Sequence, residues 1–472
     1  MAAATVIEQK PLYTILPVGQ DIIFVVSNQT AVANETKVKF CAEVHIGTTI
    51  PVTSTSNDLK GVFKTTPNNA GVGMFDLRNV IENYVKADNM AFNGSSYKGT
   101  TTTDSERHPV HLIDKYSLNK DLVRYMVIQF YVEYLNTATN VVERVTGTTI
   151  NSDEYSISNG YVKYNNLLDS LSGNFGFDMA EFYPSISVSD RKYLTNAPTT
   201  QYANSGDYGT LAFFAPTSSQ ANGVNRIRIQ FYDSTDTIIP ATNTDIVKSN
   251  GTGAYTTWSA LAKKHIVFFG CFPGNLENWS ANYATAVAAG LSHYRIFAHN
   301  AVPAIGTQSL GTVTIYVNCP DTKNFESIRL CWLNQWGAWD YYTFTKKSTR
   351  SISTQGSTYQ QLGGTWNESL YRPDSFKGGK KSFRMNATEK ILMNTDFVSE
   401  DDNVMFEELI NSPEVYLLEG YQTDTSISLL NQYVTPVRLT TSSFTRKTVA
   451  NDRLMQYTFE IEKSKTLRTQ SI

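Results

Sequence analysis

The sequence predicts a mainly β protein, with several β-sandwich-like or barrel-like domains and a few short helices. Charged residues make up only 18% of the chain, whereas aromatic residues reach 12%, with 27 Tyr and 24 Phe. A chain rich in Tyr, Phe, Thr and Val favours strands. Alternating apolar and polar residues also outnumber helical patterns, and Gly, Asn and Pro separate the alternating segments.

The N-terminal part carries the clearest elements. Strands are predicted at 21–27 (DIIFVVS), at 37–46 (KVKFCAEVHI) and at 125–135 (YMVIQFYVEYL), the last of them central in its sheet. A turn is predicted at 67–71 and a polar loop at 88–107. Between them a helix is predicted from Leu77 to Lys86, with Asp76 as its cap, because its apolar residues form one stripe.

The remaining elements follow the same logic. Strands are predicted at 227–232, 265–272, 294–298, 313–317, 414–418, 434–440 and 456–462, whereas the alanines of 279–290 also suit a helix that ends at Gly290. The polar, Gly-rich residues 350–382 indicate a loop or linker. A second helix is predicted at 400–411, capped by Ser399 and ended by Ser412-Pro413.

These elements suggest four parts. We expect an N-terminal β-rich domain with one helix (1–150), a second β-rich domain (151–300), a β module that carries a Trp-rich hairpin (301–375) and a C-terminal β-rich domain with one helix (376–472).

Residues 330–344 (LCWLNQWGAWDYYTF) predict a β-hairpin with an aromatic tip. Gly337 can adopt the positive φ that a tight turn needs. Trp332 alternates onto a strand face and is expected in the core, whereas Trp336 lies at the turn and is expected to be exposed. Trp336, Trp339 and Asp340 are therefore candidate interaction residues, suited to packing against another subunit or to stacking on a sugar.

The chain offers no recognised catalytic motif. It lacks GxxxxGK[ST], HExxH, GxSxG and a strand-linked GxGxxG, so we expect no enzyme, no catalytic residue and no cofactor. The strongest enzymatic alternative pairs Asp340 with Glu326 for glycoside hydrolysis, which needs two carboxylates at a defined separation. Hydrogen bonds from turn amides, or a pair with Arg329, explain these acids better.

Metal binding is also not expected. His108, His111 and Asp114 lie close in sequence, but the run HPVHLID indicates a loop that passes into a strand. The four cysteines Cys41, Cys271, Cys319 and Cys331 lack CxxC spacing and are expected as buried free thiols, with a Cys319–Cys331 bridge as the alternative.

The net charge and hydropathy of the chain limit the kinds of partner that the sequence predicts. A net charge of −3 and a pI near 6.1 predict no binding of nucleic acid through its phosphates. The basic stretch Lys377, Lys380, Lys381 and Arg384 is local and is expected on a solvated loop or strand edge. No apolar run is long enough to predict a membrane span, and the first residues lack the pattern of a secretory signal.

The hairpin pattern W-x-N-x-x-G-x-x-D-x-Y-x-F, at Trp332, Asn334, Gly337, Asp340, Tyr342 and Phe344, resembles a pattern in virion structural proteins of tailed bacteriophages. The stretches LINSPEVYLL (409–418), TPVRLTT (435–441) and QYTFEIE (456–462) are similar in order to β-rich tail-hub and distal-tail modules, and 68–85 fits such chains. The resemblance implies a tail-associated, hub-like or baseplate-like scaffold protein. It also implies a protein made in the host cytoplasm and located in the virion.

Three functional hypotheses follow. The first is a structural component of a phage virion, in the tail or baseplate, whose partners are further copies of itself and other virion proteins. The second is a carbohydrate-binding receptor or fibre protein that contacts a host surface glycan. The third is an all-β glycan-degrading enzyme. Assembly into rings would favour the first, glycan binding through Trp336 the second, and turnover that depends on Asp340 the third.

Overall fold

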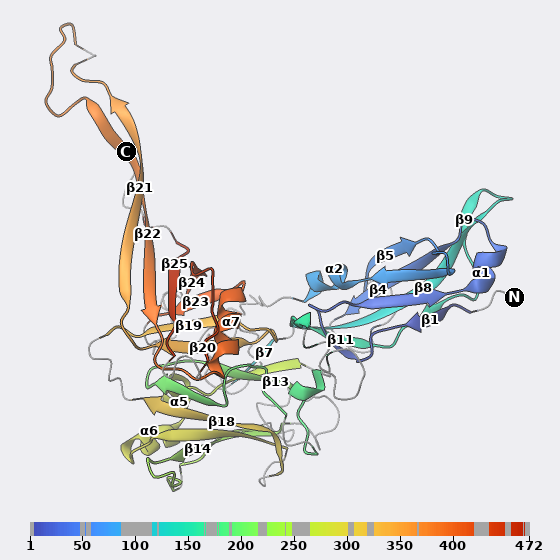
Figure 1. Ribbon diagram of the computed structural model, residues 1–472, viewed down its shortest axis with the longest axis horizontal. Coiled ribbons are helices and arrows are strands. Elements are labelled where there is room, and N and C mark those ends of the chain that lie inside the picture. The colour runs from blue at the N-terminus through green and yellow to red at the C-terminus, as the bar shows by residue number, and fades with distance from the viewer. Residues whose placement is uncertain are drawn as a thin grey trace. The chain divides into compact units, whose positions relative to one another are not determined.

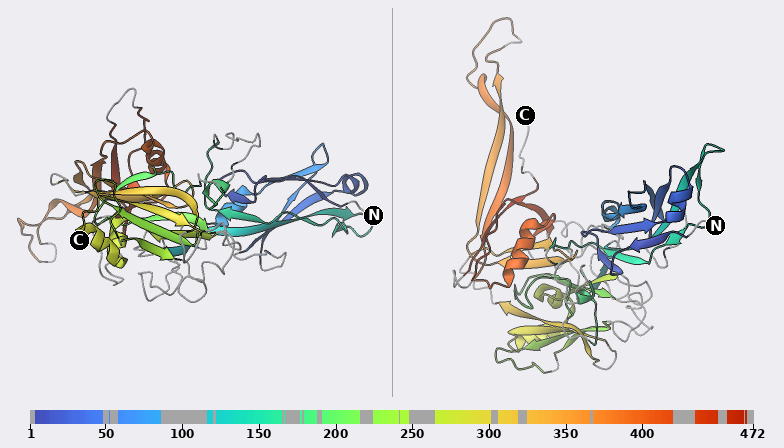
Figure 2. Two further views of the ribbon diagram at one scale, coloured as in Figure 1. Left: turned by 90° about the horizontal axis from the view of Figure 1, so that it is seen from below. Right: turned by 45° about the vertical axis from the view of Figure 1, so that its right-hand side comes forward.

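A computed structural model describes residues 4–47, 52, 58–85, 116–119, 122–164, 166, 177, 179–187, 191–215, 224–240, 242–247, 265–300, 306–318, 325–365, 368–419, 434–448, 455–465 and 467 (Figure 1). Strands account for 47% and helices for 13% of the described residues, so the predicted mainly β class with several sheets and few short helices is confirmed. Figure 2 shows the same ribbon from two other sides.

The chain forms two compact units. Unit 1 comprises Met1–Cys319, Leu333–Asp340 and Thr423–Ile427, and unit 2 comprises Pro320–Trp332, Tyr341–Gln422 and Ser428–Ile472. The hairpin turn 333–340 is therefore part of unit 1, whereas the residues on either side of it are part of unit 2. The four-part division expected from the sequence stays a prediction beside this two-unit division.

The first part of unit 1 is a sandwich of two sheets. One sheet has the order β1 (Val6–Gln9), β3 (Ile23–Ser27), β6 (Val72–Asp76). The other has the order β2 (Ile15–Pro17), β11 (Tyr155–Ser158), β8 (Val123–Asn136), β4 (Lys39–Gly47), β5 (Leu59–Thr65), and β9 (Val141–Arg144) and β10 (Ile150–Asn151) also pair with β8. The central position predicted for the 125–135 strand is confirmed.

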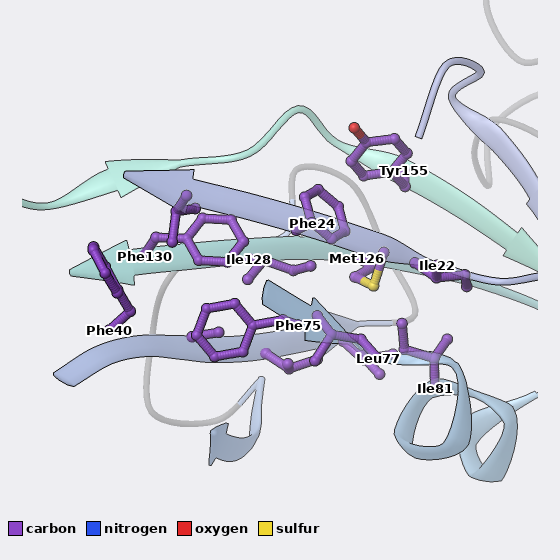
Figure 3. Packing of buried hydrophobic residues seen from close by; sticks show 14 of the residues in the cluster. Ile22, Phe24, Phe40, Phe75, Leu77, Ile81, Met126, Ile128, Phe130 and Tyr155 are labelled. Atoms are coloured by element: carbon purple, nitrogen blue, oxygen red, sulfur yellow. The ribbon is translucent and has the colours of Figure 1, made fainter. Parts of the chain in front are cut away.

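Aromatic side chains from both sheets fill the space between them (Figure 3). The Phe24 ring lies 5.5 Å from that of Phe130 and 5.7 Å from that of Tyr155, and Phe75 lies 5.8 Å from Phe130. Such tilted and edge-to-face pairs are the arrangements that aromatic rings prefer. Side chains along β4 point alternately to the two faces of the sheet, which directs Phe40 into the same core. Phe40 is fully buried there.

Two short helices accompany the sandwich, α1 (Gln29–Asn34) and α2 (Arg78–Ile81), and the turn η1 (Glu82–Tyr84) continues α2. The helix predicted over 77–86 is thus confirmed, although its end is a 3₁₀ turn. The predicted cap is wrong, because Leu77 is the N-cap and makes no side-chain cap hydrogen bond. The Asp76 carboxylate, one residue earlier, accepts from the Arg78 backbone N–H at 3.2 Å. The turn at 67–71 is also confirmed, with Gly71 at φ 73°.

The second part of unit 1 contains two further sheets. The larger has the order β12 (Thr200–Asn204), β18 (Gln308–Asn318), β17 (His293–His299), β14 (Arg226–Tyr232), β15 (Thr244–Val247), and the smaller has the order β13 (Thr210–Ala215), β16 (His265–Gly270), β7 (Tyr116–Asn119). The helical elements are η2 (Met179–Phe182), α5 (Pro273–Trp279) and α6 (Ala281–Ala288). The ambiguous segment 279–290 is therefore mostly helical, and Gly290 lies just beyond the end of α6 with φ 90°.

Unit 2 is built on one sheet with the order β20 (Trp339–Phe344), β19 (Ile328–Leu333), β23 (Val415–Leu418), β24 (Val434–Leu439), β25 (Thr458–Lys463), β22 (Gly379–Asn394), β21 (Thr349–Gln361), together with helix α7 (Asp402–Asn411). The predicted C-terminal helix and strands are confirmed. The predicted cap is wrong, because Asp401 is the N-cap. Ser399 instead donates its backbone N–H (2.8 Å) and its hydroxyl (2.9 Å) to the Asp402 carboxylate.

Cys41, Cys271 and Cys331 are buried free thiols, as predicted. Cys319, the group His108, His111 and Asp114, and the predicted loop 88–107 lie outside the described residues. Within the described part of the chain, no helix has the length and apolar character needed to cross a membrane.

Candidate functional site

The Trp hairpin turn is organised by Asn334. Its side-chain Oδ1 accepts hydrogen bonds from the backbone N–H groups of Trp336 and Ala338, both at 3.0 Å. Its Nδ2 donates to the Leu194 carbonyl at 2.9 Å, so the same side chain also fixes the turn to another segment of unit 1. Asn is suited to this position because its short amide can replace backbone partners inside a turn.

Gly337 confirms the predicted turn geometry, with φ 77°. Space also requires glycine here, because a Cβ atom would lie 1.8 Å from the Asn159 carbonyl oxygen. The Tyr161 N–H donates to the Gln335 carbonyl at 2.8 Å, next to this close approach. The turn therefore lies against the segment 159–161.

The expectation that Trp336 is exposed is wrong, since only 3% of this residue is accessible. Its ring stacks on Phe177 with the ring centres 4.9 Å apart and lies 4.6 Å from Phe182, near η2. Its Nε1–H donates to Oδ1 of Asn196 at 3.0 Å. Unit 1 supplies both the apolar contacts and the hydrogen-bond partner of this side chain, so the ring cannot stack on an external sugar in this conformation.

Trp339 and Asp340 are buried as well, with 2% and 3% of each residue accessible. The Thr195 hydroxyl donates to Asp340 Oδ1 at 2.5 Å. Burial raises the pKa of the Asp340 carboxyl to about 6, although hydrogen bonds from Thr195 and Asn334 oppose this rise. The candidate residues Trp336, Trp339 and Asp340 thus lie together inside the protein.

The other hairpin residues have separate partners. Trp332 is fully buried in unit 2, which confirms its predicted place in the core. Arg329 donates to the Thr343 hydroxyl at 2.7 Å and lies over the Tyr341 ring. Glu326, the acid considered as a catalytic partner of Asp340, accepts from Arg350 Nε at 2.9 Å. This hydrogen bond holds the pKa of Glu326 below its usual value.

The interpretation of 350–382 as a loop or linker is wrong over much of its length. β21 and β22 pair along their whole common length, from Thr349 opposite Leu392 to Gln361 opposite Gly379. β22 pairs with β25 only from Lys390 to Asn394, so the two strands continue together as a ribbon beyond the rest of their sheet (Figures 1 and 2). We call residues 351–388 the arm.

The arm exposes large apolar side chains. Seven of them are more than a third accessible, with exposed fractions from 41% to 78%: Ile352, Leu362, Leu370, Tyr371, Phe376, Phe383 and Met385. Large apolar side chains left exposed on one element are typical of surfaces that contact other molecules. Sequence reasoning missed this surface because the Ser, Thr and Gln residues of 351–361 show no apolar alternation, and their strand propensity was the only signal.

The ribbon has a defined shape. The register shifts between Ser357 and Thr358, which leaves Phe383 as an extra residue in β22, and its ring meets that of Tyr359 edge-on at 6.3 Å. Met385 lies across Gly356, where a Cβ atom would be 2.3 Å from the Met385 sulfur.

Ion pairs fix the base of the arm. Arg350 contacts three carboxylates, those of Glu326, Glu389 (2.7 Å) and Glu419 (3.2 Å). Lys463 contacts Glu389 and Glu419, both at 3.2 Å. Networks of this kind restrain their members more than isolated surface pairs do.

Comparisons with known proteins give no family. No family model matches the chain, and no curated protein matches it. One solved structure with a weak similarity is the native conformation of alpha-2-macroglobulin from E. coli, at 8% identity and a TM-score of 0.17. The alignment covers 98% of this chain and 28% of that chain, and a TM-score this low does not indicate a shared fold. In the described residues no group of three or more His, Cys, Asp or Glu side chains is arranged to hold a metal ion.

The first prediction concerns Trp336. We expect Trp336→Ala to reduce the free energy of unfolding of unit 1 by about 3–5 kcal/mol, because it opens a cavity beside Phe177 and Phe182. Calorimetry and urea unfolding measure the change. The matched control is Tyr164→Ala, whose side chain is 72% exposed in the same unit and should be silent. Equal stability of the two variants would contradict the buried position of Trp336.

The second prediction concerns Asp340. Because its folded pKa lies above the unfolded value, its contribution to stability is full below about pH 4 and is lost as pH rises through about 6. Asp340→Asn keeps an acceptor for Thr195 without the charge. We expect this variant to be more stable than the natural chain by about 1–3 kcal/mol at pH 7.5 and equal to it at pH 4. A variant less stable at pH 7.5 would show that the ionised carboxylate is required.

Proposed function

We propose that this chain is a structural component of a phage virion, in the tail or baseplate. It acts by homo-oligomeric assembly and by contact with other virion proteins. Its place is the virion, after synthesis in the host cytoplasm. The observation that carries the proposal is the arm, whose large apolar side chains stay exposed in the part of unit 2 that the structure describes.

The two-stranded structure of the arm favours contact with another polypeptide. An isolated two-stranded ribbon is marginally stable in water, and it needs a third strand or a packed face for stability. Among the described residues β21 is the last strand of its sheet, and beyond the base most residues of the ribbon are exposed. Another polypeptide that covers this ribbon would supply both the missing strand contacts and the burial of the apolar side chains.

The buried hairpin motif supports a scaffold role rather than a catalytic one. At its positions Trp332, Asn334, Asp340 and Phe344 the accessible fraction is 5% or less. The motif residues therefore maintain a turn and its packing. The oxygens of Glu326 bind Arg350, which favours a structural role for this acid as well.

The third prediction tests assembly. We expect the purified chain to form rings or fibres in negative-stain images and a large species in sedimentation velocity. The triple variant Leu370→Ser, Tyr371→Ser, Phe376→Ser should lose this species, because it removes three apolar side chains that are each 71% exposed. The matched control Met74→Ser, Val142→Ser, Tyr164→Ser changes three side chains that are 60% to 72% exposed outside the arm, and it should assemble.

The proposal fails if the natural chain remains monomeric at millimolar concentration and is missing from purified virions by mass spectrometry. If the chain self-associates but is absent from purified virions, the virion assignment is wrong and only the proposed self-association remains.

A second candidate function, carbohydrate binding, is favoured by a different surface. Four rings stack side by side across the sheet of β12, β18, β17 and β14, with centres 5.5 Å apart for Tyr202 and Tyr316, 4.7 Å for Tyr316 and His293, and 5.1 Å for His293 and Tyr232. Tyr202 ends the row on the edge strand and is 63% exposed. Arg295 covers the Tyr232 ring at the other end and donates to Asp236 at 2.7 Å. An open ring at the end of such a row is a platform for a sugar.

The fourth prediction separates this candidate from the first. If the row binds sugar, Tyr202→Ala should abolish binding on a glycan array while the chain still assembles, and Tyr371→Ala on the arm should leave glycan binding unchanged. Glycan binding that persists in Tyr202→Ala would exclude the row as the site.

A further inference from the structure

The outer edge of β21 is open. β21 spans thirteen residues and stands last in the order of its sheet, with β22 as its neighbour on one side. In the part of the chain that the structure describes, the backbone groups of 351–361 make no hydrogen bond on the other side. Such an edge is a template for a further strand. A strand of another polypeptide supplies the matching ladder of N–H and C=O groups, which a sugar or a lipid does not.

The edge of β21 lacks the features that keep open edges unpaired. Proteins protect such edges with charged side chains, lysine above all, and with proline. β22 carries Lys380 and Lys381 where it extends beyond β25, and the edge strand β5 of unit 1 carries Lys60 and Lys64. Residues 351–361 contain neither a charged residue nor a proline. The bulge of the ribbon lies in β22 and leaves β21 continuous.

The side chains of this edge suit a second copy of itself. Eight of the eleven residues 351–361 are Ser, Thr or Gln. Hydroxyl and amide groups both donate and accept hydrogen bonds, so identical residues can bond to one another across two strands. An uncharged edge selects no partner of opposite charge, and it does not repel its own copy.

The basic residues of the arm do not prevent this contact. Pairing of two β21 edges gives the strand order β22, β21, β21, β22. The two β22 strands, with Lys380 and Lys381, are then three strand spacings apart, about 14 Å. Because the Debye length is about 8 Å at physiological ionic strength, repulsion between them is largely screened.

We propose that the arms of two copies pair edge to edge, β21 against β21 in antiparallel order, to form one four-stranded sheet. The contact is a twofold one, in which the same surface serves both copies. Each ribbon gains the additional strands that a sheet needs for stability in water. The tip of each arm lies beside the base of the other. This inference rests on the proposed assembly and specifies the contact within one pair of copies, whereas rings or fibres require a second contact.

Hydrogen exchange of individual backbone amides tests the pairing. In dilute protein we expect alternate amides of 351–361 to exchange slowly, because they bond to β22, and the amides between them to exchange fast. In assembled protein the fast set should slow by about tenfold or more. A fast set that exchanges equally in both states overturns the proposal, because a contact through side chains alone leaves those amides open.

Photo-cross-linking identifies the partner segment. Copies labelled with ¹⁴N and with ¹⁵N, both carrying Tyr359→p-benzoylphenylalanine, are mixed one to one, assembled and irradiated. We expect mixed-isotope cross-links from residue 359 to residues 349–361. The matched control is the same substitution at the exposed Tyr164, which should give no cross-link to this segment. Cross-links from residue 359 that are exclusively same-isotope, or that reach only other segments, overturn the proposal.

Lysine substitution on one strand or the other locates the contact. We expect Ser353→Lys, Thr358→Lys to weaken self-association about tenfold or more in sedimentation equilibrium, with the difference from the natural chain shrinking as salt increases. The matched control Thr388→Lys, Ser382→Lys adds the same charge at the residues directly opposite on β22 and should associate like the natural chain. In both dilute variants the slowly exchanging amides show that the ribbon is still paired. Equal association of the two variants overturns the assignment to the β21 edge.

The outcomes separate this inference from the proposed function. Assembly with an unchanged β21 edge overturns the pairing and leaves the virion proposal intact. Slow β21 amides in intact virions, but not in the assembled purified chain, assign the edge to another virion protein and also overturn the pairing. A chain that never self-associates but is present in purified virions removes the pairing alone, whereas its absence from them removes the virion assignment.

Discussion

A ribbon of two strands has no interior in which apolar side chains can be buried, and this constraint governs the arm. β22 shows it within one strand. Ile391 and Met393, where the strand pairs with β25, are buried, whereas Phe383 and Met385 farther along the same strand are exposed. Hydrogen bonds to β21, the bulge at Phe383 and the ion pairs of Arg350 hold the ribbon, but none of them removes its apolar side chains from water.

The hairpin turn shows the opposite solution. Its aromatic residues are covered, because Asn334 and Gly337 shape a turn that packs within unit 1 against Asn159, Leu194, Thr195 and Asn196. The cost is a buried carboxyl at Asp340 whose pKa is raised. The residues that looked like a binding platform are therefore buried, whereas the arm exposes seven large apolar side chains.

Much of the fold could be predicted from local patterns. Alternation predicted β4 and β25, a long apolar run predicted β8, the apolar stripe predicted α2, and glycine chemistry predicted the turn at Gly337. The burial of Trp336 could not be predicted, because its partners Phe177 and Phe182 are distant in sequence and no periodicity links them to the turn. The arm could not be predicted either, since apolar alternation arises from a buried face and a ribbon without one leaves no such pattern.

The central claim is that other copies of this chain cover the arm. Hydroxyl-radical footprinting measures it directly, because it reports the solvent access of individual side chains. On going from dilute to assembled protein, oxidation of Leu362, Leu370, Tyr371 and Phe376 should fall several-fold, while oxidation of Tyr164, equally exposed outside the arm, should stay constant. Equal oxidation of the arm in both states would contradict the account.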